Sequence, residues 1–342
     1  MADSFVLYKL PNQKEIYLIE SKPKESFNIE FLQSLKDEHF VLAPFQIDSK
    51  TAAFAFPADE KQIISDKELI QLDLSFSNKL QKGIEQSASK LYQSKIVILS
   101  CKIKNGTYQK VVLSRVSKMN REKKKLQQIF SELCKKHETA FVYLLQLPNG
   151  QIWCGATPET LANYEDGKFS TMAMAGTQSL DNRNPEKVLW EQKELDEQKW
   201  VQDNIEEKLK SSQLSYTKSD TYTSQAGPLV HLRTDFESQC DSKKATQLLL
   251  NLHPTPAVCG TPTEEARNEI LNIEEHNRLY YSGFLGLYTP QKFNVFVNLR
   301  CMLVDSKHFY LFVGGGLTKD SDPKLEWEET ENKARTLLEI LI

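Results

Sequence analysis

The C-terminal segment places two carboxylates and an amine close behind a run of three glycines. The glycine run at 314–316 has no side chains, so a turn formed there lets the backbone approach a ligand closely. In the predicted helix that follows, Glu326, Glu329 and Lys333 are spaced i, i+3 and i+7, which places them on one face. That face predicts either a binding site for a charged ligand or a stripe of ion pairs in solvent.

A second pair of acids, Glu194 and Glu197, lies one turn apart on a predicted helix at 185–210. Two helices that each carry a pair of carboxylates repel each other where they meet, unless a divalent cation lies between them. Ligands that are all oxygen favour Mg²⁺, which keeps several waters and accepts one or two carboxylates directly. Together with Glu326 and Glu329, these acids predict a Mg²⁺ site.

Two further titratable residues lie at the ends of predicted strands. Lys110 opens a strand at 110–116. As a general base its amine needs a pKa lowered from about 10.4 by burial or a cationic neighbour, and otherwise it extends to water. Glu159 follows Thr157 and Pro158, a pattern typical of a helix start with Thr157 as the cap. Glu159 then either complements the helix dipole or acts as a general acid whose pKa is raised by burial.

Small and basic residues complete the candidates for a ligand pocket. A predicted strand ends in Ala175, Gly176 and Thr177, of which the last two can line a cavity floor. Tyr281 and Arg300 lie in or beside predicted strands, and Arg300 has apolar neighbours. An arginine in such a place is either ion-paired in the core or a bidentate clamp for a carboxylate.

The composition excludes several classes of function. With 43 basic against 46 acidic residues the net charge is −3, which leaves no cationic surplus for nucleic acid or an anionic membrane. No apolar run approaches the length of about eighteen residues that a membrane span needs, and the N-terminus lacks the pattern of a signal peptide. A soluble, cytoplasmic protein is therefore expected. The six cysteines are scattered without a CxxC pair, so neither a zinc site nor a disulfide framework is predicted.

The predicted elements indicate a single α+β domain over residues 1–342, since no repeat, low-complexity segment or linker divides the chain. Because the predicted strands follow one another through tight turns, their pairing should be antiparallel. Strands are predicted at 5–9, 15–20, 40–44, 52–56, 110–116, 141–146, 169–175, 293–303 and 309–313. Helices are predicted at 75–91, 122–136, 185–210, 242–250 and 264–272 and at the C-terminus.

Nine ordered motifs between Lys110 and Ile342 resemble those of a known family, the chorismate-utilising enzymes, which include anthranilate, aminodeoxychorismate, isochorismate and salicylate synthases. The motifs are KVVLSR, GATPE, MAGT, KELDE, LHPTPAV, RLYYSG, NLR, GGGL and EWEETENK. Each is weak alone, but their joint order is specific. Residues 1–100 match no part of the pattern and are interpreted as a variable N-terminal part of the sheets, before a catalytic region at 101–342. The resemblance implies two large, mostly antiparallel sheets packed face to face with helices outside.

The resemblance also implies roles for the matching residues. Lys110 corresponds to the base that deprotonates water, and Glu159 to the acid that protonates the departing C4 hydroxyl of chorismate. A Mg²⁺ ion would hold the ring carboxylate of the substrate. Its shell is implied at Glu194, Glu197, Glu326 and Glu329. Of these, Glu197 and Glu326 would be the direct ligands. The groups that bind the substrate are implied at Ala175, Gly176, Thr177, His231, Tyr281, Arg300, the backbone of Gly316, and Lys333.

Departures from the family pattern narrow the reaction. Aminodeoxychorismate synthases carry a lysine where this chain has Ala175, and an alanine leaves room for a small external nucleophile, water or ammonia. The segment at 201–207, VQDNIEE, differs from the RNDLGR run that is usual in anthranilate synthases. Water as the nucleophile would make the product isochorismate. The sequence therefore predicts an isochorismate synthase that acts on chorismate with Mg²⁺ and has no obligatory protein partner.

Other interpretations stay open at this point. A salicylate synthase forms isochorismate with the same groups and then eliminates pyruvate. A glutaminase-dependent component similar to anthranilate synthase, or a non-catalytic chorismate-binding component, would act with a partner. Gln198 stands where a histidine commonly follows the metal-binding glutamate, and Cys259 where glycine, serine or threonine is common, so each can tune the pocket. The same chemistry serves menaquinone synthesis and siderophore synthesis.

Overall fold

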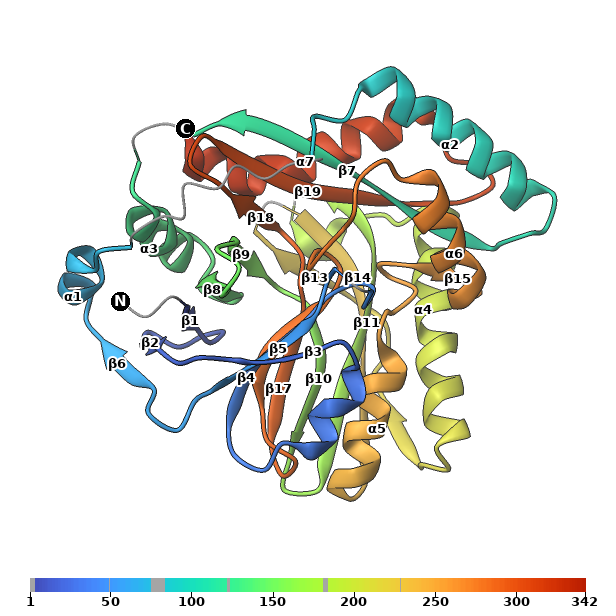
Figure 1. Cartoon of the computed structure of the whole chain (residues 1–342). Coiled ribbons are helices and arrows are strands. Elements are labelled where there is room, and N and C mark those ends of the chain that lie inside the picture. Colours follow the sequence, from blue (N-terminus) through green and yellow to red (C-terminus); the bar gives the residue numbers. More distant parts are fainter. Residues whose placement is uncertain (1–3, 49, 75–83, 122–123, 181–183, 228) are drawn as a thin grey trace.

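Two antiparallel sheets lie face to face at the centre of the fold, and helices cover their outer faces (Figure 1). The computed structural model describes residues 4–342 except 49, 75–83, 122–123, 181–183 and 228. Within those residues, each helix is too short or too polar to cross a membrane. The α+β class and the arrangement of two large sheets that the sequence predicted are confirmed.

The first sheet has nine strands, and their pairings in the described residues are antiparallel. Their order across the sheet is β15 (Gly260–Thr261), β7 (Lys110–Asn120), β19 (His308–Leu317), β18 (Cys301–Val304), β9 (Ile152–Thr157), β8 (Phe141–Gln146), β1 (Phe5–Lys9), β2 (Ile16–Ile19) and β6 (Gln62–Ile64).

The second sheet has ten strands, likewise antiparallel where the structure describes them. Their order is β12 (Tyr216–Lys218), β14 (Leu229–Gln239), β11 (Lys168–Ser179), β10 (Thr160–Glu165), β17 (Phe293–Val297), β16 (Phe284–Tyr288), β4 (His39–Ala43), β5 (Ala53–Pro57) and β3 (Lys24–Ser26), and β13 (Tyr222–Ala226) also pairs with β14. The N-terminal segment, in which the sequence shows no chemistry, thus builds one end of both sheets.

The helices that the structure describes lie outside the sheets (Figure 1). They are α1 (Asp66–Gln71), α2 (Ser89–Lys104), α3 (Leu126–Lys136), α4 (Gln192–Ser211), α5 (Ser242–Leu252), α6 (Thr263–Ile273) and α7 (Pro323–Leu341), with short 3₁₀ turns η1 (Ile29–Ser34) and η2 (Pro185–Lys187).

The core between the sheets is aromatic. Phe141 on β8 stacks on Phe296 on β17, with ring centroids 4.5 Å apart, and Tyr8 on β1 packs against Phe40 on β4. Such ring pairs add to the free energy that burial of the rings supplies. Because side chains alternate along a strand, Phe141 points into this layer while Val142 faces the helices outside. The paired rings therefore join the two sheets.

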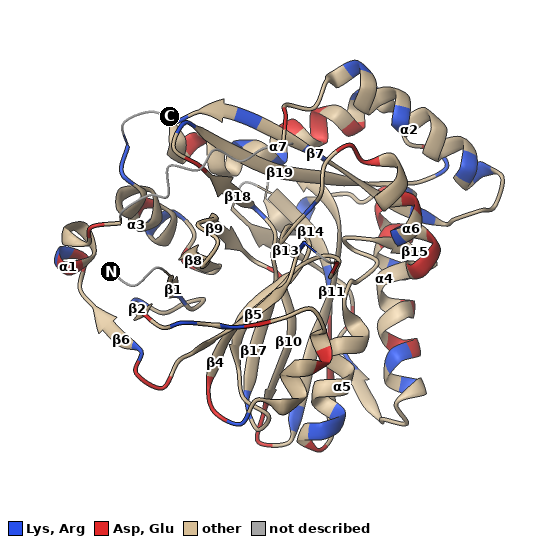
Figure 2. Ribbon diagram, in the orientation of Figure 1, with Lys and Arg blue, Asp and Glu red and all other residues tan. Residues whose placement is uncertain are grey.

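The outer faces of both sheets are buried under helices. Leu133 on α3 and Ile340 on α7 belong to one buried cluster with Leu144 on β8, in the first sheet. Val201 on α4 and Leu248 on α5 belong to the cluster on the second sheet. Strands covered on both faces read as nearly continuous apolar runs rather than as alternating patterns. Basic and acidic residues are interspersed along the outer helices, for example α4 and α5 (Figure 2), in keeping with the net charge of −3.

Three helix boundaries differ from the sequence predictions. The helix predicted at 75–91 lies partly on 75–83, outside the described residues; 84–88 are not helical, and α2 begins at Ser89. Its buried residues are spaced i, i+4, i+7, i+8 and i+11 from Tyr92, a helical period that continues past the predicted end. The helix predicted at 122–136 begins on 122–123, outside the described residues; 124–125 are not helical, and α3 begins at Leu126. α4 begins at Gln192 rather than at 185.

The prediction of a helix that starts at Pro158 was wrong. β9 ends at Thr157 in the first sheet, and β10 begins at Thr160 in the second, so the chain crosses between the sheets at 158–159. Thr157 does not cap a helix; its hydroxyl donates a hydrogen bond of 2.6 Å to the carbonyl of Val297. The signature of a helix start is local, whereas this change of sheet depends on partner strands far away in the sequence.

The strand predicted at 293–303 is in fact two strands. β17 ends at Val297 in the second sheet, and β18 begins at Cys301 in the first. Arg300 lies in the crossing between them with φ +46°, a left-handed conformation that interrupts a strand. This crossing runs beside the one at 158–159, because the Val297 amide donates to the Glu159 carbonyl at 2.9 Å. The two crossings thus bring Glu159 and Arg300 to the same place between the sheets.

Candidate functional site

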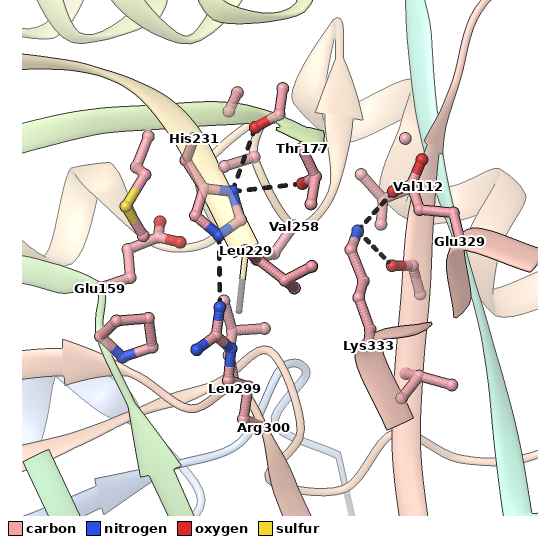
Figure 3. Close-up of a pocket in the computed structure, with 18 of the residues that line it drawn as sticks. Val112, Glu159, Thr177, Leu229, His231, Val258, Leu299, Arg300, Glu329 and Lys333 are labelled. Carbon is pink, nitrogen blue, oxygen red and sulfur yellow. Dashed lines mark hydrogen bonds and ion pairs between the residues drawn. The ribbon is translucent and has the colours of Figure 1, made fainter. Parts of the chain in front are cut away.

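A cavity lies where the two crossings approach β11, β14, β19 and α7 (Figure 3). Its empty volume is about 890 Å³ with the open mouth included. The predicted site residues that line it are Lys110, Glu159, Ala175, Gly176, Thr177, Glu197, His231, Tyr281, Arg300, Gly316, Glu329 and Lys333. Of the predicted set, Glu194 and Glu326 do not line it.

Glu159 is a buried acid in the wall of this cavity. Its residue surface is 4% exposed. Burial raises the pKa of Glu159 to about 8, against the opposing influence of Lys110, Arg300 and Lys333. The carboxyl group is therefore protonated at neutral pH, as a general acid requires. The sequence allowed two interpretations of Glu159. No helix of the described chain begins beside it, so it does not complement a helix dipole; it is a buried acid.

His231 is held as a neutral ring by its neighbours (Figure 3). An Nη2 of Arg300 lies 3.3 Å from its Nε2, and arginine can only donate, so Nε2 is the acceptor. The proton is then on Nδ1, which lies 3.1 Å from the carbonyl of Gly176 and 3.2 Å from Thr177 Oγ1. Burial, helped by Arg300 and Lys333, lowers the pKa of His231 to about 3. The histidine thus orients Arg300 without adding a charge.

Gly176 shapes this corner of the cavity through its backbone. It has φ +70°, and the register of β11 against β14 shifts between Ala175 and Thr177. A non-glycine residue is strained at this φ. The bulge turns the Gly176 carbonyl to within reach of His231. The prediction that 176–177 line the cavity floor is in keeping with this geometry.

The glycine run was predicted to form a turn, but it is a strand. Residues 314–316 belong to β19 and pair with β7. A Cβ at Gly316 would lie 2.1 Å from Glu197 Oε1 and 2.7 Å from the Cε of Lys110. Only glycine therefore lets those two side chains reach the strand. The glycines were expected to let a ligand approach the backbone closely. In this structure the side chains of Glu197 and Lys110 approach it instead.

Lys110 enters the cavity from the first residue of β7. Its residue surface is 2% exposed, and its Nζ lies 3.7 Å from Glu197 Oε1. Side chains alternate along the strand, so Val112 also lines the cavity while Val111 belongs to a buried cluster with residues of α2 and α6. Lys110 is therefore a buried amine with one carboxylate partner, and the interpretation of a lysine that extends to water was wrong.

Three of the predicted acids meet beside the glycine strand. A Cβ at Gly315 would lie 3.3 Å from Glu326 Oε2 and 3.8 Å from Glu329 Oε1, and Glu197 reaches the next glycine. Within the described part of the chain, Glu326 Oε2 and Glu197 Oε1 are buried without a hydrogen bond, although Lys110 Nζ lies 3.7 Å from the latter. Buried carboxylate oxygens without donors are costly and suit a cation.

Two lysines already pair with these acids. Lys193 Nζ lies 2.6 Å from Glu326 Oε1, and Lys333 Nζ lies 2.7 Å from Glu329 Oε1. Burial and the neighbouring Glu329 raise the pKa of Glu326. Burial acts the same way on Glu329, but Lys333 and Lys193 outweigh it and lower the pKa of Glu329. In this conformation no group of three His, Cys, Asp or Glu side chains among the described residues is arranged to hold a metal.

Glu194 is engaged elsewhere. Its Oε2 accepts a hydrogen bond of 3.0 Å from the Glu191 amide at the N-terminus of α4, and its Cβ packs near Gly176. Glu194 thus satisfies a free N–H at the helix start. Its part in a metal shell stays a prediction that this conformation does not display.

Arg278, the first residue of the RLYYSG motif, supports the cavity from outside and has no role predicted from the sequence. Its guanidinium pairs with the buried Glu274 at 2.6 Å and donates to the carbonyls of Val112 and Val258 at 2.7 and 2.8 Å. Val112 and Val258 both line the cavity. Arg278 therefore ties two walls of the cavity together. The signal in the sequence was the pair Glu274 and Arg278 at i, i+4, although neither lies in a regular element.

We expect Arg278→Leu to lower the free energy of unfolding by about 3–5 kcal/mol, because it leaves the buried carboxylate of Glu274 without the guanidinium that balances its charge, although the Ser114 amide still donates to it. Urea denaturation followed by tryptophan fluorescence measures this. The matched control is Arg267→Leu, whose partner Glu264 is exposed; its loss should cost under about 1 kcal/mol. Equal effects of the two substitutions would contradict a structural role for the Glu274 pair.

The residues 31–342 match a family model described as chorismate binding enzyme. Isochorismate synthase EntC of Escherichia coli (strain K12) is 29% identical over 222 residues, which are 62% of this chain and 56% of that relative. The match thus spans little more than half of the relative's length. The vibriobactin-specific isochorismate synthase of Vibrio cholerae serotype O1 is 26% identical over 310 residues, 87% of this chain and 78% of that one.

A solved structure shares the fold. The menaquinone-specific isochorismate synthase MenF of Escherichia coli superposes with a TM-score of 0.81 at 20% identity, and the match covers 99% of this chain and 89% of that one. The coverage includes the N-terminal segment that carries no family motif. The implied architecture of two face-to-face sheets is therefore confirmed over nearly the whole chain.

Proposed function

We propose, from the premise that this chain belongs to the chorismate-binding enzyme family, that it converts chorismate into isochorismate. The observation that carries the proposal is a buried glutamic acid, Glu159, with a pKa raised to about 8, in one cavity with a buried lysine, Lys110. The names of the similar proteins support it, since both curated relatives described above are isochorismate synthases.

In the proposed reaction, Lys110 and Glu159 transfer protons in opposite directions. The Lys110 amine takes a proton from a water molecule as the water oxygen bonds to C2 of chorismate. Glu159 gives its proton to the C4 hydroxyl, which leaves as water while both ring double bonds shift. One water enters and one leaves, so substrate and product are isomers. The raised pKa of Glu159 supports its role as donor, because a protonated carboxyl group is needed at neutral pH.

The cationic side chains of the cavity suit a substrate with two carboxylates. Arg300 and Lys333 enter it from different elements, the crossing after β17 and the helix α7 (Figure 3). Arg300 presents a planar fork that matches a carboxylate in bidentate geometry. The neutral His231 holds that fork, and Tyr281, stacked on Phe312 at 5.7 Å, closes the wall beside Gly314. We assign these groups to substrate binding.

A divalent cation, which we take to be Mg²⁺, fits the acids beside the glycine strand. The oxygens of Glu197 and Glu326 that lack a hydrogen bond among the described residues are the groups that would hold it, with Glu329 adjacent. When bound, the ion neutralises charge on the substrate's ring carboxylate and fixes its position. Glu194 would join only after release from the helix start. This donor set is all oxygen, which favours Mg²⁺ over softer metals.

The side chain at 175 supports water as the nucleophile. Ala175 lines the cavity and offers no amine that could attack the ring. A small external nucleophile is therefore required. We also propose that the protein acts without an obligatory protein partner, since the proposed acid, base and substrate-binding groups all come from this chain.

The test is product analysis by chromatography after purified protein is incubated with chorismate and Mg²⁺, without glutamine or ammonium. We expect isochorismate, and we expect none when the metal is removed with a chelator. Salicylate and pyruvate would identify a salicylate synthase instead. Anthranilate on addition of ammonium, with no hydroxylated product in its absence, would identify an amine-transferring enzyme and contradict the proposal.

A further inference from the structure

Lys193 lies among the acids that the proposed function assigns to the metal. Its Nζ is 2.6 Å from Glu326 Oε1, an oxygen that also accepts from Ser321 Oγ at 2.6 Å. The carboxylates of Glu329 and Glu197 also attract it, so three acids act on one ammonium group. No part of the proposed reaction uses this lysine.

The burial of these partners makes the arrangement informative. The side chain of Glu326 is 1% exposed, whereas that of Lys193 is 29% exposed. A carboxylate that is buried beside a second carboxylate repels it strongly unless a cation lies close. Lys193 thus supplies, from the protein itself, the positive charge that a bound metal would otherwise provide.

An ammonium group and a divalent cation cannot both occupy the space between the same carboxylate oxygens. We propose that Lys193 is a placeholder cation: it occupies the metal position beside Glu326 while the site is empty, and it must turn outward before Mg²⁺ binds. This inference rests on the proposed Mg²⁺ site and adds to it a residue that sets the affinity for the ion.

The two lysines of the site differ in their freedom to leave. Lys333 donates to the Gly314 carbonyl at 2.9 Å as well as to Glu329, so a second contact holds it in the cavity. Among the residues that the structure describes, Lys193 forms a hydrogen bond with Glu326 alone, and its partly exposed stem is flexible. Lys193 is therefore the lysine that can give way to a metal without dismantling the substrate pocket.

The first experiment is a calorimetric titration of Mg²⁺ into metal-free protein without chorismate. Lys193→Met keeps the length of the stem and removes the charge, so its affinity for Mg²⁺ should be about tenfold higher than that of the wild type. The control is Lys199→Met on the same helix. The side chain of Lys199 is 70% exposed and pairs with Asp203. This variant should bind Mg²⁺ as the wild type does.

The second experiment uses the wild-type protein and so does not depend on how a variant folds. An amine-acylating reagent is added with and without Mg²⁺, and the modified lysines are identified by mass spectrometry. Acylation of Lys193 should rise several-fold with Mg²⁺, because the ion pair with Glu326 is broken. Acylation of Lys199 should not change.

The outcomes separate this inference from the proposed function. If the wild type binds Mg²⁺ but Lys193→Met binds it no more tightly, and Lys193 acylation is unchanged by the ion, the placeholder is refuted while the metal site stands. If neither protein binds Mg²⁺, the metal site itself is refuted and the placeholder with it. Tighter binding by the variant with Mg²⁺-dependent exposure of Lys193 supports both.

Discussion

Lys110→Met is expected to lower kcat by about 10² to 10⁴-fold with chorismate, while substrate affinity stays nearly unchanged. The reason is that Lys110 is the buried amine proposed to take the proton from water, and methionine fills the same space without a base. Steady-state kinetics with coupled detection of isochorismate measures kcat, and equilibrium binding of chorismate measures affinity.

The matched control for this variant is Lys118→Met. Lys118 lies on the same strand, β7, but pairs with Glu85, whose side chain is 77% exposed. Its replacement should leave kcat within about twofold of the wild type. Turnover of Lys110→Met close to that of Lys118→Met would show that another group activates the nucleophile.

Glu159→Gln should also lose about 10² to 10⁴-fold in kcat, because the amide has the shape of the acid but no acidic proton for the leaving hydroxyl. In the wild type, Glu159 is protonated below its pKa of about 8 and loses the proton above it. Activity should therefore fall as pH rises through about 8. The residual activity of the variant should lack this alkaline limb, which a pH series of kcat measures.

Stability measurements distinguish lost chemistry from lost folding in this variant. A carboxyl group whose pKa is raised in the folded state destabilises the fold as pH rises from the unfolded value of about 4.3 towards the folded one. Glutamine does not titrate, so Glu159→Gln should be at least as stable as the wild type at pH 7. Glu165→Gln, at the exposed end of β10, is the control and should change neither property.

Much of the fold could be predicted because the sequence contains strong periodic signals and ordered motifs. The strands at 5–9 and 141–146 were placed at their observed ends, and the helices at 242–250 and 264–272 within two residues. The antiparallel pairing followed from short connections between strands. These features depend on neighbours in the chain, which is what a single sequence displays best.

The errors cluster where distant segments decide the conformation. Thr157-Pro158-Glu159 has the local signature of a helix start, yet the chain crosses there between sheets beside the crossing near Arg300. The glycines at 314–316 carry no side chain to show a strand period, and the packing of Glu197 and Lys110 that requires them comes from other elements. Sequence alone could not pair these segments.

The candidate site was predicted better than the path of the chain through it. The motifs named most of the residues that line the cavity, because residue type at a motif position is visible without a fold. Motifs could not show which partner each carboxylate contacts. Glu194 serves the start of α4, and Lys193, next to it in the same motif, holds Glu326. Such competition between partners depends on distances of a few ångströms.

The most direct test of the central claim is to run the reaction in water enriched in ¹⁸O, with purified protein, chorismate and Mg²⁺. If water activated in this cavity attacks C2, mass spectrometry will find isochorismate that is two mass units heavier, with the label in the new hydroxyl. Isochorismate that carries no label, or no isochorismate at all under these conditions, would contradict the account.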